Sequence, residues 1–370
     1  MRTIIHLLNW FFGIFFVIFA FFNAFTGNLL PAIPLFGIAL LLMPSARKFI
    51  HKKTGRSLHV LLRGLSIFIL LLIFLFLIFI GMGMKKSIYR SESIKNKLYK
   101  IYDTKMIKWP VPYETRYIDT EYGKVHVIIS GPEKAPAVVL FHASALTAWS
   151  WIHNIKNLAS RYRTYAIDTL GDANKSQLMN GGKYPMDRKG ISTLYTQVFN
   201  KLGIKKAKII GASYGGYIGM SLALNAPGRV KKLVLVGPMG LSPETEKTAI
   251  KIMLITLFPI KPLQELMCFW SLGDDPKIVA ETGLWFREII KGVTPKLCPP
   301  LTIEEEQLKN IRSPVLVILG KNDNLVGDPI IARQRAHHIP DVRIEVLNTS
   351  HAIFLEKPEK FNRLTGKFLK

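Results

Sequence analysis

The sequence predicts an α/β domain with a mostly parallel sheet and helices on both faces, preceded by transmembrane helices. Three observations support this architecture. From residue 113 onward, apolar strand patterns alternate with helical patterns, which is typical of a parallel sheet. Residues 1–84 contain long apolar runs and no acidic residue, a composition typical of membrane segments. A Gly-x-Ser-x-Gly motif at residues 211–215 connects a strand to a helix.

Residues 1–84 contain three apolar stretches that we expect to span a membrane, namely 4–25, 29–43 and 58–84. The first has about 22 residues, enough to cross a bilayer. The second is short and carries Pro31 and Pro34 near its start, so we expect a tilted or partly re-entrant helix. A cleaved signal peptide is the alternative for residues 1–26, but the apolar stretch is long and further apolar stretches follow it.

The distribution of basic residues predicts how the chain is oriented in the membrane. Residues 44–57 contain five Lys and Arg residues and no acid, so the positive-inside rule places this loop in the cytoplasm. Residues 85–108 are also basic, which opposes that orientation, but long domains translocate largely regardless of charge. We therefore expect a multi-pass protein of the cell membrane, with the domain at 113–370 on the extracytoplasmic side.

The strongly basic composition also raises the question of nucleic acid as a partner. The chain has a net charge of +25. No zinc-finger spacing, basic heptad region or aromatic RNA-binding motif accompanies this charge. We therefore expect the charge to attract anionic lipid or wall polymer, and we predict the membrane, not nucleic acid, as the partner.

Residues 85–112 are expected to form a basic juxtamembrane linker. Ile94, Leu98 and Ile101 recur at helical spacing among several lysines, as in a helix that lies on a membrane surface. A solvated basic stalk is an equally good interpretation. The Trp-Pro-Val-Pro stretch at 109–112 favours an extended end to this segment.

The domain at 113–370 is expected to open with a hairpin and to continue with buried strands. The hairpin strands are 115–120 and 124–130, and further strands are expected at 137–141, 162–168, the segment before the Ser motif, 232–237, 315–320 and 343–347. Helices are expected at 186–202, directly after the Ser motif, and at 358–369. This series predicts eight strands.

The alternation is interrupted at about 239–301. This stretch is rich in large apolar residues, namely Phe258, Met267, Phe269, Trp270, Trp285 and Phe286. We expect a helical cap over the strand ends, whose apolar side chains would line a ligand pocket. An extended set of surface helices is the alternative.

Ser213 is the candidate nucleophile. It lies in Gly211-Ala-Ser-Tyr-Gly215, between an apolar strand and a helical pattern. A serine on so tight a turn presents its hydroxyl above the sheet, and small residues two positions before and after it are needed because the backbone segments nearly touch. A chance occurrence of the motif is the alternative, and it becomes less plausible if the chain also supplies a base and an acid.

Asp323 and His351 are the candidates for the acid and the base. A serine hydroxyl needs a base to accept its proton, and a carboxylate orients that base. Asp323 follows the strand at 315–320 and His351 follows the strand at 343–347, so both are expected at the sheet edge that presents Ser213. Asp328 competes with Asp323 for the role of the acid.

An oxyanion site requires two hydrogen-bond donors near the attacked carbonyl. One is expected to be the backbone N–H of Tyr214, the residue after the nucleophile. The other is expected from the loop after the strand at 137–141, where we choose the N–H of Ser144, with Ala143 as the alternative. We expect His142 to be a structural histidine of this loop and not a second base.

On these residues, the chain from 113 to 370 resembles the α/β-hydrolase fold family. The elbow at 211–216, Asp323 and the Ser350-His351 segment with Glu356-Lys-Pro358 match the family pattern, and His142-Ala143 stands where the family usually has His-Gly. The stretch Gly171-Asp-Ala-Asn-Lys-Ser176 further resembles a subgroup of bacterial carboxylesterases. The resemblance implies a serine hydrolase, and a serine at the elbow argues against the branches of the fold that use aspartate there.

The sequence therefore predicts a membrane-anchored serine hydrolase, in first place a carboxylesterase that acts on a small-molecule or lipid ester. Lipase, thioesterase, amidase, acyltransferase and carbon–carbon hydrolase activities of the same fold remain open, as does a non-catalytic binding protein. We expect no cofactor and no metal. Cys268 and Cys298, the two cysteines, are expected to be ordinary thiols, with a disulfide between them as the alternative.

Overall fold

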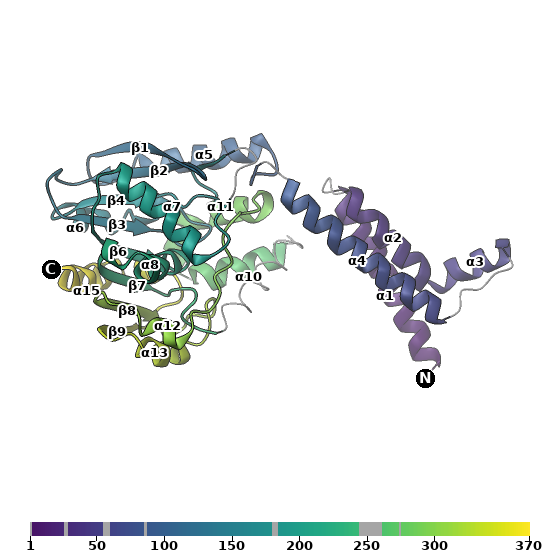
Figure 1. Cartoon of the computed structure of the whole chain (residues 1–370). Helices are drawn as coiled ribbons and strands as arrows, with labels where there is room; N and C mark the ends of the chain where they lie inside the picture. The colour runs from purple at the N-terminus through teal and green to yellow at the C-terminus, as the bar shows by residue number, and fades with distance from the viewer. Residues whose placement is uncertain are drawn as a thin grey trace. The chain divides into compact units, whose positions relative to one another are not determined.

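The structure is a computed structural model that describes residues 2–25, 29–54, 60–84, 87–179, 184–243, 261–273 and 275–370. The chain divides into two compact units, Met1–Lys86 and Ser87–Lys370, and Figure 1 shows the elements of each. We describe each unit by itself.

The N-terminal unit consists of helices. These are α1 (Arg2–Phe25), α2 (Leu29–Leu42), α3 (Pro44–Thr54) and α4 (Val60–Met84). Helix α2 packs against both α1 and α4, and its residues Ala32 and Leu35 share a small buried cluster with Ala20 and Phe74. The three apolar stretches predicted from the sequence therefore form helices that contact one another.

The length and apolar composition of these helices can be compared with the predicted membrane spans. Within the ranges that the structure describes, no single helix is both long and apolar enough to cross a membrane by itself. One pair, Ala32–Leu42 and Pro44–Lys53, reaches the required length and composition together, although the two helices are bent by 82°. The spanning role of the N-terminal helices therefore stays a prediction.

The second unit is built on one mixed sheet (Figure 1). Its strands are β1 (Tyr113–Thr120), β2 (Gly123–Ser130), β3 (Ala137–Phe141), β4 (Arg163–Ile167), β5 (Gln177–Leu178), β6 (Ala207–Ala212), β7 (Val230–Val236), β8 (Val315–Gly320) and β9 (Val342–Leu347). The order is β1-β2-β4-β3-β6-β7-β8-β9, and the short β5 pairs with β2. Strands β1 and β2 form an antiparallel hairpin, β2 pairs antiparallel with β4, and the pairs from β4 to β9 are parallel. The predicted strands are therefore present, together with one short extra strand.

Helices cover both faces of this sheet. They are α5 (Glu92–Met106), α6 (Ile155–Ala159), α7 (Arg188–Lys201), α8 (Tyr214–Asn225), α10 (Lys261–Leu272), α11 (Pro276–Gly292), α12 (Glu305–Leu308), α13 (Pro329–Ala336), α14 (Ile353–Glu356) and α15 (Pro358–Leu369), with short 3-10 helices η1 (Ala148–Trp151) and η2 (Pro227–Arg229). Side chains alternate between the faces of a strand. Val138 and Leu140 of β3 join the core beneath α6 and α15, whereas Val139 and Phe141 join the core beneath α7 and α8.

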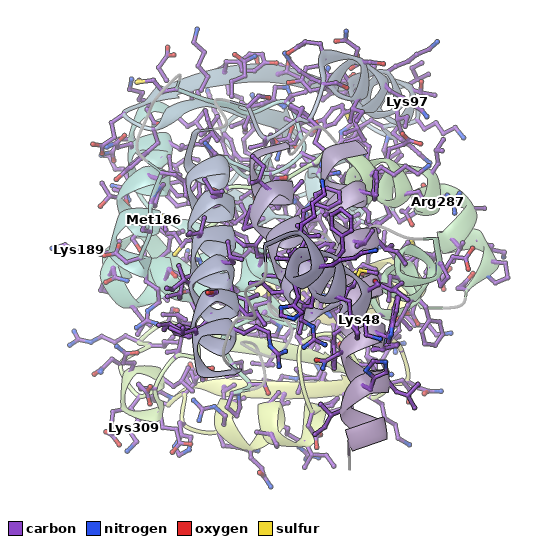
Figure 2. All side chains as sticks on the ribbon, turned by 90° about the vertical axis from the view of Figure 1, so that its right-hand side faces the viewer. Lys48, Lys97, Met186, Lys189, Arg287 and Lys309 are labelled. Atoms are coloured by element: carbon purple, nitrogen blue, oxygen red, sulfur yellow. The ribbon has the colours of Figure 1, made fainter. Side chains whose placement is uncertain are left out.

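Helix α5 differs from the linker predicted at 85–112. The side chains of Leu98, Tyr102 and Met106 are buried in the core of the second unit, and α5 packs against α11 and η1. Its polar face stays outside, where Lys97 (Figure 2) forms an ion pair of 2.9 Å with Glu288. The helical spacing was predicted correctly, but the apolar stripe packs on the protein, and the compact unit begins at Ser87 rather than at residue 113.

The stretch expected to form a cap contains helices where it is described. Helices α10 and α11 lie between β7 and β8 in sequence and pack against each other. Residues 244–260, which include Phe258, and residue 274 lie outside the described residues. The cap prediction is therefore supported by α10 and α11 alone.

Candidate active site

Ser213 lies between β6 and α8 with φ 52° and ψ −113°. A positive φ is costly for a residue with a side chain, so the surrounding contacts must hold this turn. The N–H of Ser213 donates to the carbonyl of Val236 on β7 at 2.9 Å, and its own carbonyl accepts the N–H of Met239 at 3.1 Å. The first bond joins the elbow to β7 and the second to the segment just after it, which keeps Ser213 in place.

The glycines around Ser213 are required by close backbone contacts. A Cβ atom on Gly211 would lie 2.2 Å from the carbonyl oxygen of Gly215, and one on Gly215 would lie 2.2 Å from that of Phe141. A Cβ on Gly216 would lie 2.7 Å from Cβ of Pro238. All three distances are shorter than van der Waals contact, so the tight turn expected at this motif is present.

His351 and Asp323 are paired. His351 Nδ1 lies 2.7 Å from Asp323 Oδ2, and both side chains are buried. The other carboxylate oxygen, Oδ1, accepts the backbone N–H groups of Leu325 at 2.9 Å and Val326 at 3.3 Å. These bonds fix the carboxylate, which in turn orients the imidazole ring.

Asp328, the competing candidate for the acid, has a different role. It is the N-cap of α13, and its Oδ1 accepts the N–H of Ile330 at 2.7 Å. A side chain that caps a helix in this way satisfies one of the free N–H groups of the first turn. Asp323 is therefore the carboxylate that contacts His351.

Gly237 is a residue that sequence reasoning missed. It follows β7 with φ 47°, and a Cβ atom there would lie 3.2 Å from Asp323 Oδ2 and 3.3 Å from His351 Nδ1. The backbone of residue 237 thus closes one side of the His–Asp pair. A glycine after a strand is a common sequence feature, so nothing in the pattern distinguished this one.

The loop after β3 contains the expected oxyanion donor, Ser144. The next residue, Ala145, has φ 62°, and Leu146 N–H donates to the carbonyl of Ala143 at 3.0 Å, as in a tight turn. The N–H of Ala145 donates to Asp172 Oδ2 at 2.9 Å, and the N–H of Ala173 donates to Oδ1 at 2.8 Å. A buried carboxylate therefore holds the loop that carries Ser144.

Asp172 was not among the predicted site residues, although it belongs to the stretch at 171–176 that carried the esterase resemblance. Burial raises the pKa of the Asp172 carboxyl above its ordinary value. The contact that holds the loop, with Ala145, joins residues that are 27 positions apart in the sequence, so a local pattern does not reveal it.

His142 has the structural role that we expected. Its Nε2 accepts the N–H of Thr169 at 2.9 Å, which leaves Nδ1 to donate to the carbonyl of Ala143 at 2.8 Å. A histidine with both ring nitrogens in backbone hydrogen bonds is not positioned as a second base.

Asp168, at the end of β4, connects the loop after β3 with α5. One carboxylate oxygen accepts the N–H of Ala148 at 2.8 Å, and the other accepts bonds from His126 Nδ1 at 2.8 Å and the Tyr102 hydroxyl at 2.9 Å. Burial acts to raise the pKa of Asp168, but the hydrogen bond and charge of His126 hold that pKa below its ordinary value.

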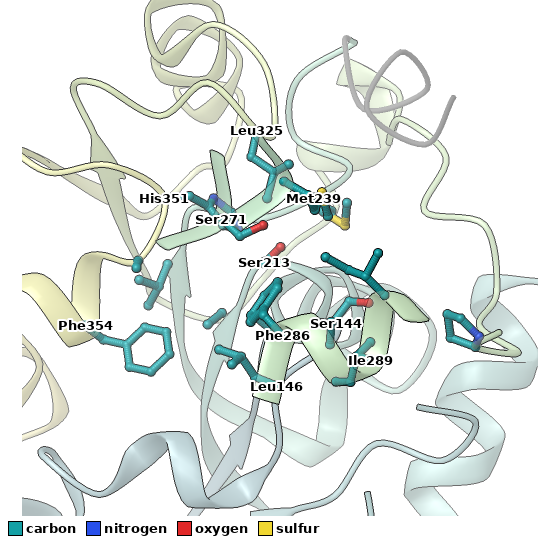
Figure 3. Close-up of a pocket in the computed structure, with 18 of the residues that line it drawn as sticks. Ser144, Leu146, Ser213, Met239, Ser271, Phe286, Ile289, Leu325, His351 and Phe354 are labelled. Carbon is teal, nitrogen blue, oxygen red and sulfur yellow. The ribbon is translucent and has the colours of Figure 1, made fainter. Parts of the chain in front are cut away.

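Ser213, Ser144 and His351 line one pocket, shown in Figure 3. The remainder of its described wall is largely apolar, with Leu146, Met239, Met267, Phe286, Ile289, Ile290, Val293, Leu325 and Phe354. Helices α10 and α11 contribute several of these side chains, and α10 also contributes Ser271. Tyr214, whose N–H is the other expected oxyanion donor, begins α8 directly after Ser213, where helix N–H groups lack intrahelical partners.

The two cysteines are free thiols. Cys268 and Cys298 are both buried and unpaired as a disulfide, which agrees with the first expectation and not with the disulfide alternative. Burial raises the pKa of both thiols, that of Cys298 to about 11. Neither is therefore a thiolate near neutral pH.

The sheet order, the strained serine and the His–Asp pair define a class of protein, and the chain belongs to the α/β-hydrolase fold family. The profile described as alpha/beta hydrolase fold matches residues 136–257. With an uncharacterised carboxylesterase, nap, of Bacillus subtilis (strain 168), the chain is 31% identical over 287 residues, which are 73% of this chain and 91% of the relative. The chain is therefore a hydrolase of this family.

Two further carboxylesterases are similar to this chain over about the same length. Carboxylesterase YbfK of Bacillus subtilis (strain 168) is 29% identical over 288 residues, which are 74% of this chain and 93% of the relative. The crystal structure of naproxen esterase from Bacillus subtilis superimposes with a TM-score of 0.64 at 30% identity, and covers 74% of this chain and 97% of that chain.

Proposed function

We propose that this protein is a carboxylesterase that is held at a membrane by its N-terminal unit and cleaves carboxylic esters through an acyl-enzyme. The observation that carries this proposal is the 2.7 Å contact between His351 Nδ1 and Asp323 Oδ2, because His351 lines the same pocket as Ser213. The carboxylesterases at about 30% identity support ester substrates.

In the proposed reaction, Ser213 Oγ attacks the ester carbonyl carbon while His351 Nε2 accepts the hydroxyl proton. The negative charge that develops on the carbonyl oxygen is stabilised by the N–H groups of Tyr214 and Ser144. His351 then gives its proton to the leaving alcohol, and Asp323 stabilises the imidazolium in between. A water molecule, deprotonated by the same histidine, attacks the acyl-enzyme and releases the acid.

The geometry also supports a neutral, apolar ester rather than a charged one. The described lining residues include no Lys, Arg, Asp or Glu. A charged substrate group in such a pocket would lose its hydration without gaining an ionic partner. The proposal therefore assigns the apolar wall formed by α11 to the hydrocarbon part of the substrate.

The test uses the full chain in detergent with p-nitrophenyl esters of increasing acyl length. We expect turnover by the wild type, a loss of several orders of magnitude in Ser213→Ala and His351→Ala, and nearly unchanged activity in the control His338→Gln, whose imidazole pairs with Glu305 at 3.3 Å. A folded wild type that is inert on every ester, and is not labelled at Ser213 by a fluorophosphonate, would favour a non-catalytic binding protein instead.

The exposed side chains of the N-terminal unit support the membrane part of the proposal. Large apolar side chains lie on the outside of its helices, including Phe11, Phe15, Ile18, Phe21, Leu40, Leu65, Phe68 and Leu72. Soluble surfaces rarely carry so many contiguous apolar groups, whereas a lipid environment accommodates them. We propose that this unit is embedded in the cell membrane, with residues 44–57 on the cytoplasmic side and the catalytic unit outside.

Reporter fusions after residue 57 and after residue 110 test this orientation. We expect a reporter that requires the cytoplasm to be active after residue 57 and inactive after residue 110. Cytoplasmic activity at both positions would overturn the extracytoplasmic placement, and recovery of the full chain without membranes would overturn the anchor.

A further inference from the structure

Ser271, in the last turn of α10, has a buried hydroxyl that points into the pocket. The residue is only 6% exposed, and its Oγ has no hydrogen-bond partner among the described atoms. Figure 3 shows this oxygen directed toward Ser213, and His351 lines the same pocket. A buried hydroxyl without a partner is unfavourable, so the hydroxyl of Ser271 is available to hydrogen-bond a molecule bound in the pocket.

Other serines of this unit show the usual alternative. A helical serine commonly donates to the carbonyl four residues earlier, and Ser221 in α8 donates to the carbonyl of Tyr217 at 2.7 Å. The neighbouring Ser192 also donates to a backbone carbonyl, that of Ser221, at 2.7 Å. Ser271 differs from both because its hydroxyl is directed to the pocket.

The end of α10 is held against the segment that carries His351. Gly273 follows the helix with φ 72°, and a Cβ atom there would lie 2.8 Å from Ser350 Oγ. Ser350 is itself fixed, because its N–H donates to Glu356 Oε1 at 2.9 Å. The position of Ser271 relative to His351 is therefore set by contacts that do not involve the substrate.

The side of the pocket on which Ser271 lies decides which part of the substrate it contacts. In the proposed reaction His351 donates a proton to the leaving oxygen, so the alcohol part of the ester must lie beside His351. Ser144 and Ser213, the other serines of the described lining, belong to the reaction itself. Ser271 is thus the hydroxyl available to the alcohol part.

We propose that Ser271 is a specificity-determining residue that hydrogen-bonds a hydroxyl or ether oxygen on the alcohol part of the ester, and that the preferred substrates are neutral monoesters of polyols. This inference rests on the proposed function. In such an ester the second oxygen lies two carbons from the ester oxygen, which places it beside the scissile bond. A phosphate on the alcohol does not fit, because no Lys or Arg is among the described lining residues.

The test compares two esters of equal shape with the full chain in a zwitterionic detergent that carries no hydroxyl or ester group. These are ethylene glycol monobutyrate and propyl butyrate, which differ by a terminal hydroxyl in place of a methyl. We expect Ser271→Ala to lower kcat/KM for the glycol ester about tenfold, as for one hydrogen bond, and to leave propyl butyrate and p-nitrophenyl butyrate within about twofold. The ratio between the two matched esters is therefore expected to fall about tenfold.

A matched control is Ser150→Ala, which removes another buried serine hydroxyl without a partner, outside the described lining of this pocket. This variant is expected to keep the wild-type ratio. An unchanged ratio in Ser271→Ala, or an equal loss on all esters, would overturn the role of Ser271. The assignment to the alcohol side would be overturned if Ser271→Ala lowered kcat/KM only for a propyl ester that carries the hydroxyl on its acyl part.

The control substrate separates this inference from the function on which it rests. A wild type that turns over p-nitrophenyl butyrate and shows no change of ratio in Ser271→Ala overturns the role of Ser271 alone. A folded wild type that turns over none of the esters overturns the esterase, and the inference with it.

Discussion

The hydroxyl of Tyr102 donates a hydrogen bond of 2.9 Å to Asp168 Oδ2, and this bond joins α5 to the end of β4. The other carboxylate oxygen accepts the N–H of Ala148, directly after the loop that carries Ser144. The segment expected to be a linker is therefore connected, through one buried carboxylate, to the loop beside the nucleophile.

Replacing Tyr102 with Phe is expected to lower the free energy of unfolding by about 1.5–3 kcal/mol, the usual range for a hydrogen bond to a charged group. The ring stays in the core, so only the bond to Asp168 is removed. Urea unfolding of residues 87–370 measures the change, with Tyr113→Phe as the control because Tyr113 is 44% exposed. Equal stability of both variants would mean that the bond adds nothing.

Asp323→Asn is expected to lower kcat about ten-thousandfold, because an amide cannot hold the imidazole in the required tautomer and charge state. Asp328→Asn is the matched control. Asparagine caps helices about as well as aspartate, so the N-cap bond to Ile330 persists and kcat is expected to change less than twofold. Steady-state kinetics with p-nitrophenyl butyrate decide the matter, and similar losses in both variants would contradict the assignment of Asp323.

Gly215→Ala is expected to abolish activity and to destabilise the second unit, because the added Cβ would lie 2.2 Å from the carbonyl oxygen of Phe141. The nearest atoms all belong to the backbone of Phe141 and His142, so no flexible side chain can move aside. Gly228→Ala is the control, since a Cβ there meets nothing within 4 Å. Thermal unfolding and ester turnover measured on both variants test this, and a fully active Gly215→Ala enzyme would show that the elbow tolerates expansion.

His153 and Glu281 form an ion pair of 2.9 Å between Nε2 and Oε2 that ties the turn after η1 to α11. The hydrogen bond to Glu281 raises the pKa of His153 from its ordinary 6.5, and the hydrogen bond to His153 lowers the pKa of Glu281 from its ordinary 4.5. The stabilisation from His153 is complete below pH 6.5 and is lost as the pH rises through the raised value. The stabilisation from Glu281 is complete above pH 4.5 and is lost as the pH falls through the lowered value.

The pair therefore stabilises the protein most between the two ordinary values. His153→Gln is expected to lower Tm more near pH 5.5 than near pH 9, by a small amount because His153 is 43% exposed and solvent screens the charges. Tm of wild type and variant at the two pH values tests the sign. A larger difference at the higher pH would contradict it.

The sequence predicted the sheet and the positions of Ser213, Asp323 and His351 because each depends on local pattern. A buried parallel strand is a continuous apolar run, and the residue after it lies at a known edge of the sheet. The motif around Ser213 shows its tight turn through the glycines themselves. These signals lie within a few residues of what they predict.

Other features depend on contacts between distant segments, which no local pattern reveals. The spacing of Ile94, Leu98 and Ile101 indicates a helix with an apolar face, but a membrane surface and a protein core both bury such a face. The role of Asp172 depends on Ala145, and that of Ser271 on the contact between Gly273 and Ser350. In each case the sequence contains both residues without indicating that they meet.

Gly237 gives the site a weakness that its reacting groups do not share. Any side chain there would extend into the space beside the His351–Asp323 contact, and its φ of 47° already disfavours every residue except glycine. A substitution at the residue after β7 is therefore expected to lower activity by displacing His351 or Asp323, with every reacting group still in the chain. A side chain at residue 237 would thus interfere with catalysis from within the chain, as a bound inhibitor does from outside.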